Sequence, residues 1–550
     1  MIKSLRPTLF SIRNINNVAR TLSSSHNNNY ENKYKSYHKS PSHYVLVGTG
    51  LATFIGFHIY DINKNRVHAE ANIEENDVGK WKENLPTYTA KEVSQHTDNK
   101  IGIWVTYKEG VYDVTNFVNE HPGGDQIMIA AGSSVEPFWL LYGIHKNPHV
   151  FKILESLRIG NLSKSDDVSL TQDMSDPYAK EPLRHTALNP ASKKPFNAET
   201  SPALLVENFI TPNELFYVRN HLPVPDINPD TYELEIEIEG KGSKIFTLDE
   251  LKKLPSKTIT STIMCAGNRR SEMTQVKPVK GLNWGPAAIG NAKFTGVPLR
   301  DVLRLAGLTE KDEEKNNHVL FEGEDMDATG STYGASIPIW KALDKRGDVL
   351  LAYEMNGVPI PRDHGFPVRV IVPGVVGARN VKWLTKVIVS EKESDSHWQQ
   401  NDYKGFSPST DWDTVDFTKS PAIQELPVIS AICKPLDCEI VKAVDGYITV
   451  KGYAWSGGGQ KIVRVDVTGD QGKTWHVANL LQDSAQPPQH WSWTLWTVKI
   501  PVDKNTKMVE LWAKAVDSSY NTQPETFENI WNLRGVLSNA YHRIRVKVIH

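Results

Sequence analysis

The sequence predicts a multidomain α+β protein that ends in an all-β sandwich. The chain has 550 residues, which is too many for one hydrophobic core at about 150 residues per domain. Its middle part mixes alternating runs, such as residues 232–238, with helical patterns, such as residues 298–305, and this mixture is typical of an α+β architecture. Beyond Pro421 alternating runs dominate, so a separate β domain is expected there.

The overall composition is that of folded, water-soluble domains. Hydrophobic residues make up 39% of the chain and charged residues 23%, which excludes a mostly disordered chain and a multi-span membrane protein. The 62 basic and 64 acidic residues leave a net charge of −2. Global charge therefore gives no support for nucleic-acid binding, and any anion site must depend on local arginines.

The first folded unit carries two histidines in a pattern suited to haem. Residues 101–115 form two alternating runs around a turn at Gly110, which predicts a hairpin. The motif His121-Pro-Gly-Gly follows, and His145 comes 24 residues after His121, with apolar residues between them. Two neutral imidazoles facing an apolar cleft can fill both axial positions of a haem iron, and such a centre carries single electrons.

The His-Pro-Gly-Gly motif alone is more often a simple turn, so the prediction depends on its surroundings. Residues 85–162 resemble the cytochrome b5 domain throughout. The resemblance implies one haem b per subunit, with His121 and His145 as ligands of the iron. His149 is the alternative second ligand, but the spacing in that family favours His145.

Cysteine usage restricts the metal chemistry. Three cysteines exclude a disulfide scaffold and a four-thiolate metal site within one chain. Cys433 and Cys438 lie five residues apart and either pair or stay reduced. Cys265 ends a strand-like run and precedes Arg269 and Arg270, whose positive charge favours a thiolate. From these residues alone, Cys265 is a buried apolar filler, a nucleophile or a metal ligand.

Four ordered blocks resemble the sulfite oxidase family: residues 216–225, 265–277, 362–383 and 402–408. The likeness covers essentially the whole chain. It implies oxidation of sulfite to sulfate at a molybdenum-molybdopterin centre, one per subunit, in which Cys265 supplies the protein thiolate to molybdenum. The electrons would then leave one at a time through the haem to cytochrome c.

The resemblance also assigns the remaining site residues. Those matched to the pterin and its phosphate are Phe216, Tyr217, Val218, Arg219, Asn220, Asp325, His364, Arg369, Asn380, Val381 and Lys382. Those matched to the substrate pocket are Arg219, Arg270, Tyr403 and Trp284. On composition alone, each arginine would more often form a surface ion pair, and the loop containing Gly374 and Gly377 would be an ordinary turn.

The C-terminal region reads as an immunoglobulin-like sandwich. Alternating runs at residues 447–455 and 461–467 are separated by glycine-rich turns. The segment 455–460 (WSGGGQ) lacks the following helix and Lys-Ser/Thr of a phosphate loop, so it is predicted to be a hairpin turn. The family resemblance implies that this region pairs two subunits, giving a homodimer.

The N-terminal residues read as a targeting segment. Residues 1–30 contain several basic residues and no acidic one, as in a mitochondrial presequence. The apolar run 44–60 reaches only about 25 Å as a helix, short of a ~30 Å hydrocarbon core. Together they predict a signal for the mitochondrial intermembrane space. The alternatives are a disordered basic tail for residues 1–30 and an uncleaved inner-membrane anchor for residues 44–60.

These observations divide the chain into five parts. They are a targeting segment (1–76), a haem domain (82–162), a flexible linker (163–177), a molybdenum-pterin domain (178–417) and a dimerisation domain (418–550). Two other functions compete. An assimilatory nitrate reductase places its haem domain after the molybdenum region, unlike this chain. A non-enzymatic haem carrier would contain no molybdenum.

Overall fold

The structure is a computed structural model that describes residues 77–123, 127, 128, 130–163, 177–327 and 329–550. The predicted targeting segment, its apolar run and most of the predicted linker lie outside these residues. Within the described ranges, no helix is long and apolar enough to cross a membrane.

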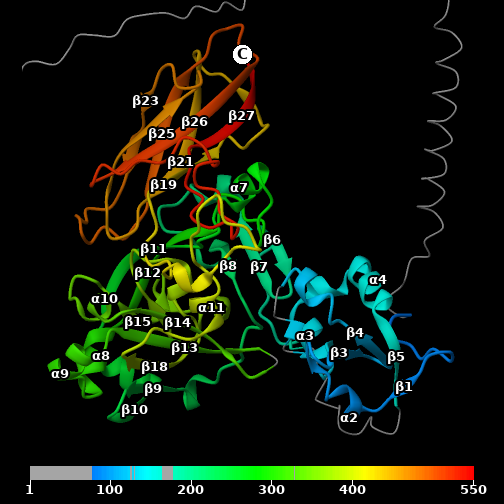
Figure 1. Cartoon of the computed structure of the whole chain (residues 1–550). Helices are drawn as coiled ribbons and strands as arrows, with labels where there is room; N and C mark the ends of the chain where they lie inside the picture. Colours follow the sequence, from blue (N-terminus) through cyan, green and yellow to red (C-terminus); the bar gives the residue numbers. More distant parts are fainter. Residues whose placement is uncertain (1–76, 124–126, 129, 164–176, 328) are drawn as a thin grey trace, which may run out of the picture. The chain divides into compact units, whose positions relative to one another are not determined.

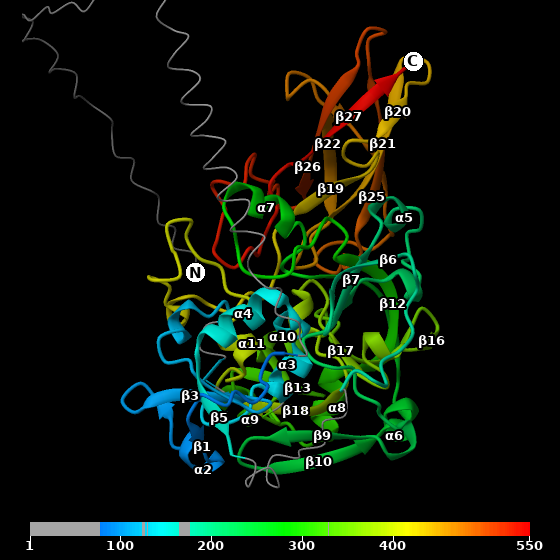
Figure 2. The same ribbon diagram turned by 90° about the vertical axis from the view of Figure 1, so that its right-hand side faces the viewer.

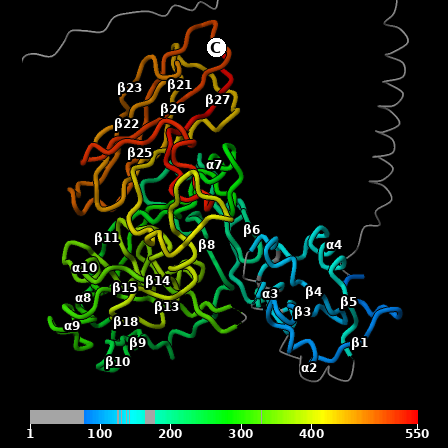
Figure 3. The backbone as a smooth tube through the Cα atoms, in the orientation of Figure 1, coloured from blue at the N-terminus to red at the C-terminus, as the bar shows by residue number. Residues whose placement is uncertain are grey.

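The N-terminal region contains a five-stranded sheet in the order β1-β5-β4-β3-β2. Its strands are β1 (Thr87–Tyr88), β2 (Thr97–Asp98), β3 (Gly102–Tyr107), β4 (Gly110–Asp113) and β5 (Arg158–Leu162). Its helices are α2 (Ala90–Val93), η1 (Val118–Glu120), α3 (Glu136–Leu141), η3 (Gly143–Lys146) and α4 (Pro148–Ser156). Strands β3 and β4 pair antiparallel around a two-residue turn, which confirms the predicted hairpin; Figure 3 shows their backbones in blue.

The middle region is built on two five-stranded sheets and one three-stranded sheet. Their orders are β10-β9-β18-β13-β14, β11-β12-β15-β16 with β17 paired to β15, and β6-β7-β8. The strands are β6 (Leu188–Lys193), β7 (Phe196–Thr200), β8 (Val218–Arg219), β9 (Glu233–Ile238), β10 (Gly242–Thr247), β11 (Lys257–Met264), β12 (Ile289–Pro298), β13 (His318–Met326), β14 (Thr332–Pro338), β15 (Leu350–Met355), β16 (Val358–Pro359), β17 (Arg369–Ile371) and β18 (Leu384–Ser390).

Short helices connect these strands. They are α5 (Pro202–Leu205), α6 (Leu248–Lys253), α7 (Arg270–Val276), α8 (Leu299–Leu305), α9 (Glu310–Lys315), α10 (Ile339–Leu343) and α11 (His397–Gln400). In α8, Leu299, Val302 and Leu303 are buried, because positions three and four apart share one helix face. In β9, alternate residues are buried, as the predicted alternation requires; Figure 2 shows β9 beside its antiparallel partner β10.

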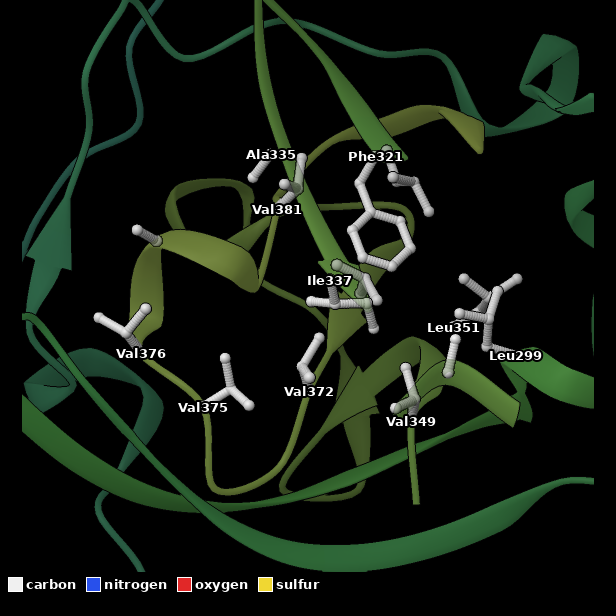
Figure 4. Packing of buried hydrophobic residues seen from close by; sticks show 14 of the residues in the cluster. Leu299, Phe321, Ala335, Ile337, Val349, Leu351, Val372, Val375, Val376 and Val381 are labelled. Carbon is white, nitrogen blue, oxygen red and sulfur yellow. The ribbon is translucent and has the colours of Figure 1, made fainter. Parts of the chain in front are cut away.

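One hydrophobic core joins the two larger sheets of the middle region. Figure 4 shows Phe321 of β13 and Ile337 of β14 close to Leu351 of β15. The segment that follows β17 adds Val372 and Val376 to the same core. This packing fixes the loops after β11 and β17, and those loops carry the candidate active site.

The C-terminal region is an all-β sandwich of two sheets, ordered β19-β21-β25-β24 and β20-β27-β26-β22-β23. Figure 1 shows these strands in yellow to red. Their bounds are β19 (Ile429–Lys434), β20 (Ile440–Lys442), β21 (Tyr447–Trp455), β22 (Ile462–Thr468), β23 (His476–Val477), β24 (Asn479–Leu481), β25 (Thr494–Pro501), β26 (Met508–Asp517) and β27 (His542–Ile549). The multidomain α+β class with a C-terminal β sandwich is confirmed.

One predicted turn is wrong. The glycine-rich segment 455–460 joins β21 to β22, but these strands belong to different sheets, so the segment crosses between sheets and closes no hairpin. The amide of Gly458 donates to the carbonyl of Gly374 (3.0 Å), and a Cβ on Gly374 would lie 2.9 Å from the nitrogen of Gly458. The glycines therefore permit a close contact with the middle region, which the sequence pattern did not reveal.

The two C-terminal cysteines are both free thiols. Cys433 is buried in β19 and Cys438 is exposed. The open alternative of a disulfide is therefore absent from this structure. Burial raises the pKa of the Cys433 thiol well above its ordinary value, which keeps it protonated and inert.

Candidate active site

A pocket in the middle region collects most of the predicted pterin residues. The predicted residues that line it are Phe216, Tyr217, Arg219, Cys265, Asp325, His364, Arg369, Asn380, Val381, Lys382 and Tyr403. They come from segments far apart in the sequence, including β8, the end of β11, β13, β17 and the loop after α11. The fold therefore brings together residues that the sequence showed only as separate motifs.

Three predicted residues lie behind the pocket wall. Val218 packs with Leu188 and Ala198 in the small three-stranded sheet. The side chain of Asn220 bonds to Asp363 and to Lys382, which places it in support of the lining lysine. Trp284 is fully buried, and its ring centre lies 6.5 Å from that of Tyr217 in an edge-to-face arrangement.

Cys265 stands at the first position after β11 and is 5% exposed. Its amide donates to the carbonyl of Ala288 (3.0 Å), and its carbonyl accepts from the amide of Asn268 (3.0 Å). Arg269 then adopts a left-handed backbone with φ of 64°, which turns the chain into helix α7. The thiol is thus held by a turn whose backbone is bonded on both sides, and it lines the pocket.

Arg270 does not line the pocket, although it lies near it. Its Nε donates to the carbonyl of Gly535 (2.9 Å) and its Nη1 to the carbonyl of Leu282 (2.9 Å). Three glycines surround its side chain. A Cβ at Gly267 or Gly281 would lie 2.5 or 2.7 Å from a guanidinium atom, and one at Gly535 would lie 2.8 Å from Arg270 Cγ. The space for this side chain therefore exists only because these three positions lack side chains.

Lys382 lies at the centre of a partly buried polar cluster. Its Nζ donates to the carbonyl of Arg219 (3.0 Å), to the carbonyl of Asp363 (2.9 Å) and to Oδ1 of Asn220. Asp363 in turn forms a bidentate pair with Arg184 at 2.8 and 2.9 Å. Burial lowers the pKa of Lys382 to about 7, although Asp363 opposes this shift. All three donors of the ammonium are used within the protein.

Two buried polar atoms at the pocket test whether a pterin group fits. Oδ1 of Asp325 and Nε of Arg369 have no hydrogen-bond partner among the described residues. Burial raises the pKa of Asp325 to about 7. Buried polar groups are normally paired, so one unpaired acceptor and one unpaired donor are suited to a ligand with polar ring edges and an anionic group. With Cys265 lining the same pocket, the residues fit a molybdenum-pterin group.

Arg219 and Tyr403 supply polar groups suited to a small oxyanion. Nη1 of Arg219 donates to Oδ1 of Asn197 (3.1 Å) and to the carbonyl of Asn220. Burial acts to lower the pKa of Arg219, but the nearby Tyr403 and Cys265 raise it overall, so the guanidinium is charged. Burial raises the pKa of Tyr403 to about 12, so its phenol is protonated. Both groups can therefore donate hydrogen bonds to an anion.

The pocket also contains residues that the sequence analysis did not single out. His221, Tyr333 and Asp363 line it directly. His221 and Asp363 adjoin predicted residues in the chain, so adjacency was an available signal for both. Arg534 forms an ion pair with Asp402, the residue before Tyr403. No motif signalled Arg534, because it lies in the part predicted to be sandwich.

The two predicted haem ligands face each other in the N-terminal region. The rings of His121 and His145 have centres 6.2 Å apart and planes within 7° of each other. Two metal–imidazole bonds account for about 4 Å of such a separation, and the ring widths account for the rest. Nδ1 of His145 lies 3.0 Å from the carbonyl of Tyr142, which fixes Nδ1–H as the donor and leaves Nε2 for a metal. The residues fit a haem iron.

His149, the alternative haem ligand, lies in a different environment from His145. It is exposed near the start of α4, where its backbone amide donates to Oδ1 of Asn147 (2.9 Å). His145 is half-buried beside Trp139, with ring centres 5.4 Å apart. Burial lowers the pKa of His145, so its imidazole is neutral, the form that binds iron. The geometry favours His145 over His149.

Comparisons with known proteins give the class of each region. Residues 89–163 match the cytochrome b5-like heme/steroid binding domain, residues 221–398 the oxidoreductase molybdopterin binding domain, and residues 420–549 the Mo-co oxidoreductase dimerisation domain. The fold and the pocket thus define a molybdopterin oxidoreductase with a haem-binding domain.

Relatives that match most of the chain identify its family within this class. The mitochondrial sulfite oxidase of Drosophila melanogaster is 61% identical over 470 residues, covering 84% of this chain and 81% of that protein. That of Homo sapiens is 55% identical over 468 residues, covering 85% of each. The chain belongs to the sulfite oxidase family. Among solved structures, the sulfane dehydrogenase SoxCD from Paracoccus pantotrophus matches with a TM-score of 0.52 and 25% identity, covering 66% of this chain and 86% of that chain.

Proposed function

We propose that this protein oxidises sulfite to sulfate and passes the electrons one at a time through its haem to cytochrome c. The observation that carries the proposal is the pocket that Cys265, Arg219 and Tyr403 line together with Asp325 and Arg369, each of which has one polar atom without a partner among the described residues. Membership of the sulfite oxidase family supports the choice of sulfite.

The proposed role of each pocket residue depends on where it lies. When bound, the molybdenum-pterin group supplies the two-electron redox chemistry and the oxygen atom. Cys265 holds its metal, while Asp325 and Arg369 pair with its polar edges. The other lining residues proposed to hold it are Phe216, Tyr217, His364, Asn380, Val381 and Lys382. Val218 and Asn220 act from behind by fixing β8 and Lys382.

The cationic and hydroxyl groups of the pocket are proposed to bind sulfite. Arg219 provides a partly buried positive charge, and Tyr403 provides a hydroxyl donor. Such fixed donors favour an oxyanion in a site that excludes water. Arg270 contributes charge from its glycine-lined position, and Trp284 closes the apolar wall behind Tyr217. His121 and His145 would both hold the haem iron, and a haem held by two histidines would supply single-electron transfer rather than oxygen binding.

The proposed domain bounds, assembly and location of the protein follow from the same family. We place the five parts of the chain at 1–76, 82–162, 163–177, 178–417 and 418–550, and we propose that the last of them pairs two subunits into a homodimer. The dimerisation-domain match at residues 420–549 supports this pairing. The relatives are named as mitochondrial proteins. We propose the intermembrane space of the mitochondrion, where cytochrome c is available as acceptor.

One experiment tests the electron path. Purified protein loaded with haem and molybdenum is mixed with sulfite without oxygen, and the haem bands are followed by stopped-flow absorbance. The haem is expected to become reduced, and added oxidised cytochrome c is expected to reoxidise it. Cys265→Ser should abolish the reduction while haem content stays unchanged, whereas Cys438→Ser, at an exposed thiol, should retain it. A haem that stays oxidised in the molybdenum-replete wild type would contradict the proposal.

Cell fractionation and mass measurement test the setting. Protease protection in intact mitochondria, lost when the outer membrane is opened, is expected for an intermembrane-space protein. Light scattering after size-exclusion chromatography should give twice the mass of one chain. Protection that persists after the outer membrane is opened would contradict the intermembrane-space location. A monomeric mass would contradict the homodimer.

A further inference from the structure

Glu199 of β7 anchors the loop at residues 284–288, which is bonded to the backbone around Cys265. Oε1 of Glu199 accepts from the amide of Gly285 (2.7 Å), and Oε2 accepts from the amide of Ala287 (2.9 Å). Burial raises the pKa of Glu199, and the two amides, the only other contributors among the described residues, act to lower it. The carboxylate is therefore engaged with this loop alone, through two charge-assisted hydrogen bonds.

The same loop holds the turn of Cys265. The amide of Cys265 donates to the carbonyl of Ala288 (3.0 Å), and the amide of Arg269 donates to the carbonyl of Gly285 (2.8 Å). Gly285 therefore binds Glu199 through its N–H and the turn after Cys265 through its C=O. A Cβ at Gly285 would lie 2.9 Å from Oε1 of Glu199, so this close approach of the carboxylate requires a glycine.

Strand β7 also supports the cationic side of the pocket. Asn197 lies two residues before Glu199, so the two side chains point to the same face of the strand. Oδ1 of Asn197 accepts from Nη1 of Arg219 (3.1 Å) and from the amide of Asn220 (2.9 Å). Alternate residues of one strand therefore hold a pocket arginine and the loop on which the thiol depends.

We propose that Glu199 is a positioning residue for the Cys265 thiol: its carboxylate fixes the loop 284–288, and that loop fixes the thiol in the pocket. The inference rests on the proposed function for the role of the thiol as a metal ligand. The hydrogen bonds stand on the structure alone. Glu199 is not among the residues that line the pocket, so it acts through the loop.

The three cysteines of the chain allow a test that needs no turnover. The full-length protein is prepared without molybdenum and treated with iodoacetamide, and labelling at each cysteine is followed by mass spectrometry. Cys265, which is 5% exposed and lines the pocket, reports on the loop. The exposed Cys438 is the internal standard, and the buried Cys433 becomes labelled only if the fold opens.

The matched variants change the carboxylate alone. Glu199→Gln has nearly the same shape, but its NH₂ group faces one of the two amides and cannot accept from it. Labelling of Cys265 relative to Cys438 should therefore rise about tenfold, because one charge-assisted bond no longer opposes local opening. Glu199→Asp keeps the charge on a shorter side chain and should give a smaller rise. Glu314→Gln, at an exposed residue of α9, is the control and should match the wild type.

Labelling of Cys433 separates a local effect from general unfolding. An unchanged Cys265 ratio in Glu199→Gln, with Cys433 unlabelled, would overturn the inference. If Cys433 becomes labelled in that variant, the fold has opened and Glu199→Asp decides the question. A raised Cys265 ratio in Glu199→Asp with Cys433 still protected supports the inference, and a wild-type ratio overturns it.

Kinetics of the loaded protein give a second readout. In stopped-flow mixing with sulfite, Glu199→Gln should lower the limiting rate of haem reduction. The sulfite concentration that gives half of this rate should stay the same, because Arg219 and Tyr403 still line the pocket. A raised half-saturating concentration with an unchanged limiting rate would assign Glu199 to substrate binding and overturn the inference.

The two proposals fail differently. Suppose that sulfite does not reduce the haem of the wild type, but Glu199→Gln raises the labelling of Cys265 as expected. The proposed function is then wrong, and the hold of Glu199 on the thiol stands. If sulfite reduces the haem while the labelling ratio is unchanged, only the positioning role is wrong.

Discussion

The side-chain amide of Asn268 donates a 2.8 Å hydrogen bond to the hydroxyl of Tyr453, and this bond ties the sandwich to the loop of Cys265. The Tyr453 hydroxyl in turn donates to the carbonyl of Pro286 (2.7 Å), while Oδ1 of Asn268 accepts from the amide of Ala288 (3.0 Å). Asn268 is three residues beyond the predicted metal ligand. A strand of the sandwich, β21, therefore helps to hold the turn that follows Cys265.

Removing the Tyr453 hydroxyl should destabilise this junction. Tyr453 is fully buried, so Tyr453→Phe leaves the Asn268 amide and the Pro286 carbonyl without their partner. The expected loss in unfolding free energy is about 1–3 kcal/mol, the cost of an unsatisfied buried group. Urea unfolding followed by tryptophan fluorescence measures it. Tyr447→Phe, at a residue 44% exposed in the same strand, should change the midpoint little. Equal midpoints for both variants would contradict the role of the buried bond.

Arg269 should tolerate no replacement by lysine. Its guanidinium pairs with both carboxylate oxygens of Glu272 at 2.6 Å and donates to the carbonyls of Ser430 (3.0 Å) and Ala540 (2.7 Å). A lysine ammonium cannot reproduce this planar fork, and the partly buried Glu272 would lose its full partner. Arg269→Lys should cost about 3–5 kcal/mol in unfolding free energy. Denaturant unfolding tests this, with the exposed Arg346→Lys as control; a loss below 1 kcal/mol would argue against the fork.

Haem content should distinguish the histidines of the N-terminal region. His121→Ala or His145→Ala removes one of the two facing imidazoles, so haem should be lost or should change from six- to five-coordinate. His149→Ala alters an exposed residue and should leave the absorbance spectrum unchanged. The haem-to-protein ratio and the Soret band report the result. If the spectrum of His149→Ala changed and that of His145→Ala did not, His149 rather than His145 would be the second haem ligand.

Acid should weaken the junction through His542. Burial lowers the pKa of His542 to about 4, and its Nδ1 accepts a bond from the amide of Ile432 (3.0 Å), so the folded ring is neutral. The unfolded chain binds a proton below about pH 6.5, so it holds more protons than the folded chain between pH 6.5 and 4. Stability from this group is complete above pH 6.5 and falls by roughly 3 kcal/mol as the pH drops to 4.

The change in unfolding midpoint with pH measures this effect. His542→Gln retains an acceptor for Ile432 but does not titrate, so its midpoint should fall less steeply in acid than that of the wild type. His149→Gln should follow the wild-type curve. Parallel curves for His542→Gln and the wild type would assign the acid sensitivity to other groups.

The sequence predicted the parts of the site that lie within continuous motifs. Cys265 after a strand and the paired histidines at 121 and 145 could be found because periodicity and local chemistry coincide there. Arg534 and the contact between Gly374 and Gly458 could not be found, because each depends on segments brought together by tertiary packing. The glycine-rich segment 455–460 was wrongly predicted to be a hairpin turn for the same reason. Hairpin turns and connections between two sheets have similar local composition, and only tertiary packing distinguishes them.

The glycines around Arg270 have a genetic consequence. Gly267, Gly281 and Gly535 lie in three separate stretches of the gene, yet a side chain at any of them meets the same arginine. Missense changes at these codons should therefore produce one shared defect, displacement of a single positive charge beside the sulfite pocket, with the haem domain left intact. Organisms carrying any of the three changes would then be expected to fall into one phenotypic group, despite the distance between the mutations.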